Sequence, residues 1–347
     1  MDLMLFDQVI AFDHYRQKVF LITGVMTDDP ENSYQKAEAK LKEMADLIRN
    51  GKQKEFPSLK LKSSIEPQFP KAKYCEMVEK AKHYIHEGDI FQVVLSNPMR
   101  AKAEGSLFDT YRVLRATNPS PYMFYFSSDD IEIAGASPET LARLAGTELS
   151  TFPLAGTRPR GKTKEEDLAL EKGLLADEKE RAEHNMLVDL GRNDLGRIAR
   201  PGTVNVERLM EVERFSHVMH LTSRITARLQ PDLDALDVLA ATFPAGTVSG
   251  APKVRTMEII AETEQLPRGP YAGCIGWLGL DDDNVSLDTG ITIRSMWVKD
   301  GKLHWQAGGG IVFDSDPVAE WNEVYNKSAI MRTVLNTTGE DHVPAHR

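Results

Sequence analysis

The spacing of apolar residues predicts helices and strands that follow one another without regular alternation. Apolar or alternating runs typical of strands occur in "IFQVVLS" (90–96), "YMFYFS" (122–127) and "VMHLTSRITARL" (218–229). Helical spacing occurs at 29–50, 74–85, 176–190 and from Asp316 to about Leu335. Because strands and helices are mixed without a repeating strand–helix–strand unit, the pattern predicts an α+β fold.

The first 70 residues are predicted to form a separate N-terminal region. A strand pair at 3–26 precedes the charged helix at 29–50, and a lysine-rich segment broken by prolines follows at 51–70. We place the main boundary in that segment and predict it to be a linker. Residues 71–336 then form the second and larger domain, and 337–347 a disordered tail.

Two local patterns near the middle of the chain predict unusual backbone. Ser137 and Pro138 have the order of a helix cap and a first-turn proline, which predicts a short helix with Glu139 at its start. The stretch "TFPLAGTRPRG" (151–161) holds two prolines and two glycines, which predicts a constrained loop. Its two arginines, Arg158 and Arg160, add positive charge suited to a small anion.

Composition narrows the class of protein. The 347 residues are 41% hydrophobic and 27% charged, typical of a globular protein with a sizeable core. A net charge of −10 argues against nucleic acid and acidic membranes as partners, since both need a basic surface. Cys75 and Cys274 are far apart, and neither a signal peptide nor a membrane-length apolar run is present. We therefore expect a cytoplasmic protein.

Acidic pairs at helical spacing are the first candidates for chemistry. Glu180 and Glu183 share one helix face, and Glu320, Glu323 and Lys327 share another. Such pairs suit a solvated surface, and Glu180 also has the spacing of a capping box. Two helices that each offer a pair of glutamates could also hold one Mg²⁺ ion between them. The spacing leaves these alternatives open.

Polar residues within strands and glycine-rich loops are the second group of candidates. Gln92 interrupts an apolar strand, so its amide either pairs with backbone or faces a polar cavity. His220 is either a hydrogen-bonded structural residue or a catalyst. "PAGTVSGAPK" and "QAGGGIV" match neither the phosphate loop of nucleotide hydrolases nor the dinucleotide fingerprint. Each is either a tight turn or a place where backbone approaches a ligand.

Taken together, these stretches resemble the chorismate-utilising enzymes, most closely the large (aminase) subunit of anthranilate synthase. The matching segments follow the family order from about Tyr74 to Leu335: "GDIFQVVLS", "NPSPYMFY", "ASPETL", "PLAGTRPRG", "DEKERAEHNMLVDLGRNDLGRI", "RFSHVMHLTSRI", "FPAGTVSGAPKVRTMEII", "RGPYAGCIGW", "DTGITIRS", "QAGGGIV" and "EWNEVYNKSAI". The resemblance implies a β-sandwich core with helices packed outside and a Mg²⁺-dependent reaction on chorismate.

The resemblance also implies roles for individual residues. Glu183 and Glu323 match the Mg²⁺ ligands, and Glu180 and Glu320 support them. Glu139 matches the general acid that protonates the departing ring hydroxyl. Gly156, Thr157 and His220 match groups on the ring-carboxylate side of the pocket. The remaining substrate-binding positions are Thr247, Tyr271, Arg294, Gly308, Gly310 and Lys327.

Two positions are expected to select the reaction. Relatives that add water carry a lysine base where this chain has Gln92, and ammonia needs no such base. Relatives that make aminodeoxychorismate generally carry a lysine nucleophile where this chain has Ala155. The pair implies a lyase that converts chorismate and ammonia to anthranilate and pyruvate in tryptophan biosynthesis.

The cysteines lack a glutaminase-type setting, so we expect a separate glutamine amidotransferase subunit, component II, to supply the ammonia. Alternatives are an aminodeoxychorismate synthase of the folate pathway, a water-using relative, and a non-catalytic remnant. Family large subunits carry a further N-terminal segment with a Leu-Glu-Ser-type motif for tryptophan, which we do not find. Because only the "NPSPYMF" half (118–124) is present, we expect insensitivity to tryptophan.

Overall fold

The structure is a computed structural model that describes residues 2–215, 218–280 and 286–339, and it divides into two compact units. Unit 1 is Met1–Glu55 and unit 2 is Phe56–Arg347, so the division falls within the segment 51–70. In unit 1, β1 (Gln8–Asp13) pairs antiparallel with β2 (Lys18–Thr23), and α1 (Pro30–Asn50) follows. The Asp29 carboxylate caps α1 by accepting a hydrogen bond from the Asn32 backbone N–H, 3.4 Å away.

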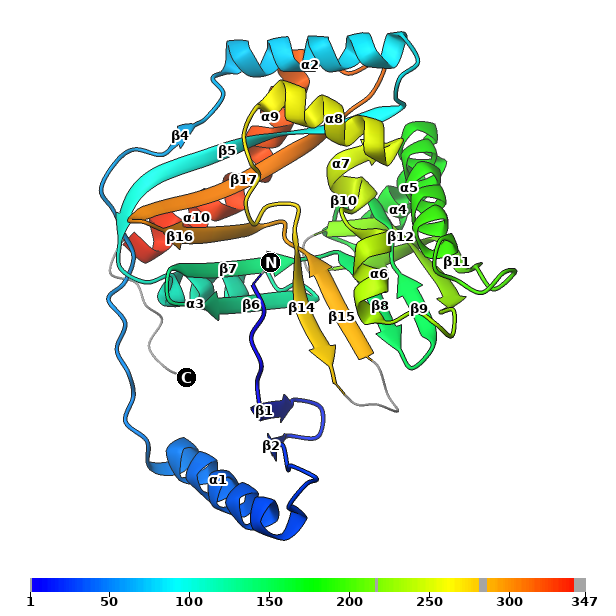
Figure 1. Ribbon diagram of the computed structural model, residues 1–347. Coiled ribbons are helices and arrows are strands. Elements are labelled where there is room, and N and C mark those ends of the chain that lie inside the picture. Colours follow the sequence, from blue (N-terminus) through cyan, green and yellow to red (C-terminus); the bar gives the residue numbers. More distant parts are fainter. Residues whose placement is uncertain (1, 216–217, 281–285, 340–347) are drawn as a thin grey trace. The chain divides into compact units, whose positions relative to one another are not determined.

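Unit 2 contains two large antiparallel sheets (Figure 1). The seven-stranded sheet has the order β10-β12-β9-β8-β15-β14, with β11 beside β12. Its strands are β8 (Thr140–Ala145), β9 (Glu148–Thr151), β10 (Leu154–Pro159), β11 (Asn205–Arg214), β12 (Val218–Arg228), β14 (Cys274–Gly279) and β15 (Ser286–Ile291). The eight-stranded sheet has the order β13-β5-β17-β16-β7-β6, with β3 and β4 beside β5. Its strands are β3 (Lys60–Leu61), β4 (Glu66–Pro67), β5 (Gln92–Glu104), β6 (Tyr122–Ser127), β7 (Ile131–Ser137), β13 (Gly250–Ala251), β16 (Ser295–Lys299) and β17 (Lys302–Ile311).

Helices cover these sheets and complete their cores. They are α2 (Lys71–His86), α3 (Phe108–Thr117), α4 (Lys164–Ala176), α5 (Glu178–Gly196), α6 (Ala235–Thr242), α7 (Gly246–Ser249), α8 (Lys253–Glu264), α9 (Pro317–Lys327) and α10 (Ala329–Gly339). One core joins α5 and α6 to the seven-stranded sheet and includes Trp297 of the other sheet. Two more cores join α3 and α10, and α2, α8 and α9, to the eight-stranded sheet. The predicted α+β class is confirmed.

Two of the places where the chain crosses between the two sheets are neighbours. It leaves the eight-stranded sheet after β7 and enters the other at β8, and it returns between β15 and β16. The Ala136 N–H donates to the Arg294 carbonyl at 3.1 Å, and the Ile291 N–H donates to the Glu139 carbonyl at 2.9 Å. These two bonds place Glu139 and Arg294 on adjacent crossings.

Several local predictions were wrong. The short helix expected after Ser137 is absent, because 140–145 pair with β9 and β15 and bury Leu141 and Leu144. "LAGTRP" (154–159) is the strand β10 rather than a loop, with a register shift between Ala155 and Arg158. The expected linker contains β3 and β4, which pair with β5. Sheet pairing thus overrode the proline and glycine signals.

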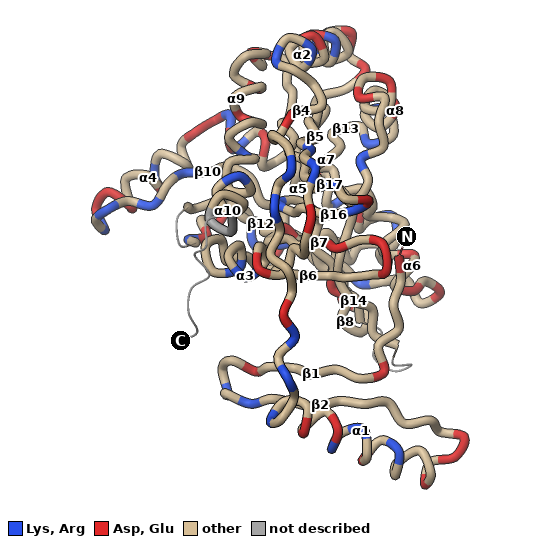
Figure 2. The backbone as a smooth tube through the Cα atoms, turned by 90° about the vertical axis from the view of Figure 1, so that its left-hand side faces the viewer, with Lys and Arg blue, Asp and Glu red and all other residues tan. Residues whose placement is uncertain are grey.

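The C-terminal end also differs from expectation. The predicted last helix is divided into α9 and α10, which meet at Ser328, and α10 extends to Gly339. Residues 337–339, predicted to be disordered, are therefore helical, and the rest of the predicted tail lies outside the described residues. In the described part of the chain, no helix is both long and apolar enough to cross a membrane. Figure 2 shows acidic and basic residues interspersed along α1 and α2.

Candidate active site

The four acidic residues come from two helices. Asp177 caps α5 by accepting hydrogen bonds from the backbone N–H groups of Lys179 and Glu180 at 3.1 and 3.2 Å. The Glu180 carboxylate accepts a hydrogen bond from Arg158 of β10, 3.0 Å away. Glu180 therefore ties the start of α5 to β10, and the N-terminal cap of α5 is made by Asp177.

The carboxylates of α5 and α9 face the same region. Burial raises the pKa of Glu183, and the charges of Glu180 and Glu323 raise it further. Glu183 keeps contact with solvent. The protein atoms around its carboxyl group still displace part of the water that would stabilise the charge, and this raises its pKa above the ordinary value. Glu323 pairs with Lys327 across 2.7 Å. Glu183 thus lies close to carboxylates from both helices.

Glu320 is the buried member of this group, with 8% of its surface exposed. Its Oε1 accepts a hydrogen bond from the Ser315 hydroxyl at 2.6 Å, whereas its Oε2 is buried without a partner among the described residues. Burial raises its pKa, partly offset by Ser315. A buried carboxylate oxygen without a donor is costly unless a cation or proton reaches it.

These residues fit a hard divalent cation in donor type. Across the described ranges, no three His, Cys, Asp or Glu side chains lie close enough together to hold a metal ion. The donor set nevertheless consists of carboxylate oxygens, the ligands that Mg²⁺ prefers. One of those oxygens is the unpaired Oε2 of Glu320.

Glu139 lies where the chain crosses from β7 to β8. Only 8% of its surface is exposed, and burial raises its pKa to about 7, against the opposing influence of Thr247 and Arg294. The Thr247 hydroxyl favours the carboxylate by proximity but makes no hydrogen bond of normal geometry within the described chain. Glu139, Gly246 and Thr247 line a small cavity of about 40 Å³. A carboxyl group in this setting holds a proton near neutral pH.

His220 lies on β12 with 4% of its surface exposed. Its Nδ1 is 2.8 Å from the Gly156 carbonyl and 3.1 Å from the Thr157 hydroxyl. Since a carbonyl can only accept, Nδ1 carries the hydrogen, which leaves Nε2 as the acceptor of the neutral ring. Burial lowers the pKa of His220, so the neutral ring is favoured.

Gly156 shapes this side of the site. Its φ of +66° is a left-handed conformation that favours glycine. A Cβ there would lie 3.0 Å from Leu174 and 3.1 Å from Glu180 Oε2. The residue therefore brings β10 backbone close to both His220 and an acidic residue of α5.

The glycines of β17 allow close approach of side chains, rather than forming a tight turn. A Cβ on Gly310 would lie 2.1 Å from Gln92 Nε2, and one on Gly308 would lie 2.6 Å from the Tyr271 hydroxyl. Lys327 Nζ donates to the Gly308 carbonyl at 3.3 Å. Gln92 is buried, and its Oε1 has no partner in the described chain, in agreement with a side chain that faces a polar space.

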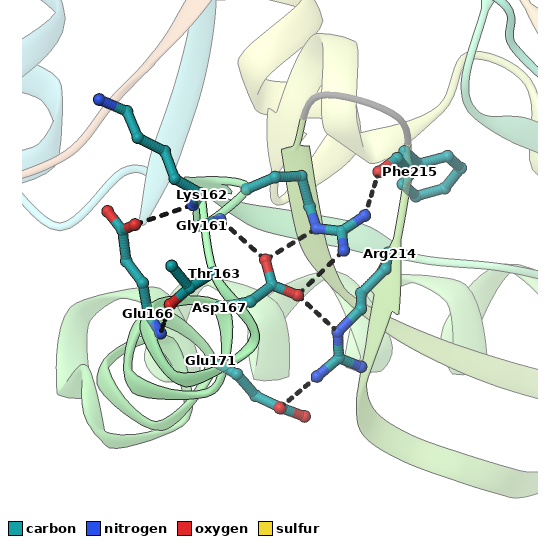
Figure 3. A network of polar contacts seen from close by, with 9 residues as sticks. Gly161, Lys162, Thr163, Glu166, Asp167, Glu171, Arg214 and Phe215 are labelled. Atoms are coloured by element: carbon teal, nitrogen blue, oxygen red, sulfur yellow. Dashed lines mark hydrogen bonds and ion pairs between the residues drawn. The ribbon is translucent and has the colours of Figure 1, made fainter.

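The two arginines of "TRPRG" are paired within the chain and do not form the anion site considered above. Arg158 contacts Asp177 at 2.7 Å as well as Glu180. Arg160 donates to both oxygens of Asp167, at 2.8 and 3.0 Å, and to the Phe215 carbonyl at 2.8 Å. Figure 3 shows the contacts around Asp167, in which Arg214 bonds to the same Asp167 and to Glu171.

Hydrogen bonds, close approaches and electrostatic influences connect the fifteen predicted site residues. Arg294 influences the pKa values of both Glu139 and His220, and Glu180 influences that of His220. A larger cavity of about 340 Å³ lies between α2 and α8, and none of the predicted residues line it. Cavity size therefore does not identify the site. Three of the predicted residues, Gln92, Thr247 and Glu320, carry buried polar atoms without a partner among the described residues. The sequence analysis did not single out Glu264 and Arg268, which form a buried ion pair. The available signal was the position of Arg268 at the start of the family-like segment "RGPYAGCIGW".

Comparison with known proteins assigns the family. A model of the chorismate binding enzyme family matches residues 1–333. Anthranilate synthase component 1 of Acetivibrio thermocellus is 45% identical over 97% of this chain and 69% of its own length. Aminodeoxychorismate synthase component 1 of Bacillus subtilis is 42% identical over 97% of this chain and 71% of its own length.

A solved structure agrees with these relatives. The crystal structure of anthranilate synthase component I from Streptococcus pneumoniae TIGR4 superposes with a TM-score of 0.83 and 41% identity. The superposition covers 94% of this chain and 72% of that one. This chain belongs to the family of chorismate binding enzymes and is a chorismate-utilising enzyme.

Proposed function

We propose that this chain is the aminase component of an anthranilate synthase. The reaction takes chorismate and ammonia to anthranilate, pyruvate and water. Ammonia adds next to the ring carboxylate as the ring hydroxyl leaves, and the enolpyruvyl group is then lost as pyruvate. The observation that supports this choice is Gln92, whose amide lies against Gly310 in the site where water-using relatives carry a lysine base.

Binding is assigned to groups that face both carboxylates of chorismate. β17 continues beyond its last pairing with β16 at Trp305, so Gly308 and Gly310 have β5 on one side and no strand on the other among the described residues. The backbone edge of β17 that faces away from β5, together with Tyr271, Arg294 and Lys327, suits the enolpyruvyl carboxylate. His220 and Thr157 contact the side of the ring carboxylate.

Proton transfer is assigned to Glu139. With its pKa raised to about 7, it holds a proton at neutral pH and donates it to the departing hydroxyl. Gln92 cannot act as a base, and ammonia attacks through its own lone pair without one. Mg²⁺, held by Glu183 and Glu323 with support from Glu180 and Glu320, would supply positive charge for the ring carboxylate.

A separate glutamine amidotransferase component is proposed to supply ammonia in the cell, since relatives such as the one from Acetivibrio thermocellus are named component 1. Aminodeoxychorismate synthase is the second candidate, because a relative with that name is 42% identical. Ala155, in place of a lysine nucleophile, favours anthranilate formation.

The test is to incubate the purified chain with chorismate, MgCl₂ and ammonium at alkaline pH. We expect anthranilate and pyruvate in equal amounts, detected by fluorescence and chromatography. A product that retains the enolpyruvyl group would favour the second candidate. Absence of turnover would support a non-catalytic role, and anthranilate formed from glutamine alone would contradict the need for a partner.

A further inference from the structure

A buried ion pair lies beside the proposed substrate site. The side chains of Arg268 and Glu264 are 15% and 2% exposed. Arg268 Nε lies 2.9 Å from Glu264 Oε2, and Arg268 Nη2 lies 2.7 Å from Glu264 Oε1. Two parallel bonds of this kind fix the direction of the guanidinium plane as well as its position.

The same two side chains bind the backbone of other elements. Arg268 donates to the Val248 carbonyl of α7 at 2.6 Å and to the Val94 carbonyl of β5 at 2.7 Å. Glu264 Oε1 accepts from both the backbone N–H and the hydroxyl of Ser96, each at 2.8 Å. The pair therefore joins α7 and β5 to the end of α8.

Each joined element carries a proposed substrate group. Val248 follows Thr247 directly. Val94 lies opposite Gly310 in the register of β5 and β17, and Ser96 lies opposite Gly308. The Arg268 guanidinium also lies 5.7 Å from the centre of the Tyr271 ring.

We propose that Arg268, oriented by Glu264, is a positioning residue that sets the relative placement of Thr247, Tyr271 and the Gly308–Gly310 strand around chorismate. This inference rests on the proposed substrate site. Stability alone is a weak explanation for the pair, because well-packed apolar residues often replace a buried ion pair at no loss of stability. What apolar residues cannot reproduce is the set of directed bonds to two backbone carbonyls.

The test is Arg268→Lys in the full chain. Lysine keeps the charge opposite Glu264, but its single ammonium group cannot bond to Glu264, Val94 and Val248 in the same plane. We expect KM for chorismate to rise about tenfold or more, since the binding elements are no longer held in register. A loss of folded protein lowers the apparent kcat but leaves KM unchanged, so KM separates positioning from stability.

If the lysine variant does not fold, the second variant is Glu264→Gln/Arg268→Gln, which removes both charges. Its KM for chorismate is measured and interpreted in the same way. Lys73→Met/Glu76→Leu, at an exposed pair on α2, is the control and should leave KM unchanged. A chorismate KM within twofold of wild type in the folded variant overturns the inference. The wild-type chain is assayed first, because its failure to make anthranilate rejects the proposed function instead. In that event the same variants are compared by their Kd for chorismate, where tenfold weaker binding supports the inference and equal binding overturns it.

Discussion

Asp167 and Glu139 are carboxylates in unit 2 with equally small exposed surfaces, but Glu139 is more deeply enclosed by protein and the two have opposite properties. Each has 8% of its surface exposed. Asp167 accepts hydrogen bonds from Arg160, Arg214 and the Gly161 backbone, and these donors hold its pKa below the ordinary value. Glu139 has only the weak influence of Thr247 and Arg294, and burial raises its pKa to about 7. At Glu139 burial outweighs the few opposing groups and favours the protonated form, whereas at Asp167 the donors outweigh burial and favour the carboxylate.

The difference separates two uses of a buried acid. All the donors to Asp167 belong to the protein itself. The carboxylate therefore connects α4 to β11 and to the segment that follows β10. Around the candidate site, Gln92 Oε1, Thr247 Oγ1 and Glu320 Oε2 lack partners within the described residues. Unpaired buried polar atoms cost free energy in the free protein and suit groups that a ligand satisfies.

The largest expected effect comes from removing the carboxylates assigned to Mg²⁺. Glu183→Gln and Glu323→Gln should each lower kcat/KM for chorismate by about a thousandfold or more, since several kcal/mol of charge stabilisation are lost. Ammonia-dependent anthranilate formation, measured over a range of MgCl₂ concentrations, tests this. Asp189→Asn, at an exposed position on α5, the helix that carries Glu183, is the control. Full turnover of either variant in chelator-treated buffer would contradict the metal assignment.

Glu139→Gln should lower kcat by about a hundredfold to a thousandfold, because a general acid contributes that much. In the wild-type chain, kcat/KM calculated per neutral ammonia should fall above about pH 7, as Glu139 loses its proton. The variant should lack this fall. A wild-type profile that stays flat through neutral pH would show that Glu139 is not the proton donor.

Glu139→Gln also tests how the raised pKa of Glu139 affects the free energy of unfolding. The folded-state pKa of Glu139 is raised, so the folded protein loses stability as pH rises from the unfolded value toward about 7. At alkaline pH, Glu139→Gln should therefore be more stable than wild type by on the order of 3 kcal/mol. The difference in stability between variant and wild type should vanish at about pH 4. Urea denaturation at the two pH values measures it, and equal stability at both would contradict the raised pKa.

Gln92→Lys should have a smaller effect, an approximately tenfold loss of ammonia-dependent kcat/KM, or about 1.4 kcal/mol. The lysine places a base and a charge against Gly310, where the amide now lies. Product analysis should also show whether water chemistry appears. Gln35→Lys on the exposed surface of α1 is the control. Unchanged anthranilate output would mean that Gln92 is only a core amide.

The sequence predicted elements whose signals are local and missed those decided by distant partners. α2 follows from the spacing of Tyr74, Met77, Val78 and Ala81, all of which are buried. β8 could not be predicted, because Pro138 has the position of a helix start and only pairing with β9 and β15 overrides it. Likewise the apolar pattern of 286–298 predicts one strand, whereas the structure has β15 and β16, and Arg294, with a φ of +49°, lies at the end of the crossing between them.

The candidate site shows the same division. Its acidic and glycine-rich positions came from motifs, although spacing alone left each of them open to a structural interpretation. Glu264 and Arg268 have the four-residue spacing of an ordinary surface helix pair. α8 instead ends at Glu264 and is followed by Gln265, whose φ of +51° is left-handed, and the pair lies buried against β5. Tertiary contacts of this kind have no local signal in one sequence.

The smallest effect on activity is expected at Asp167, the paired member of the comparison. Asp167→Asn removes the charge that two guanidinium groups share, so the melting temperature should fall by several degrees while kcat/KM changes little. Because the folded-state pKa of Asp167 is lowered, its stabilisation is complete above the unfolded value of about 3.9 and is lost as pH falls below it. The gap in melting temperature between variant and wild type should therefore be widest at neutral pH and narrow in acid. Asp130→Asn, which removes an exposed ion pair with Lys299, is the control and should shift the melting temperature far less. A variant that melted like wild type but lost turnover would reverse the comparison, because the paired carboxylate would then serve the reaction and not the fold.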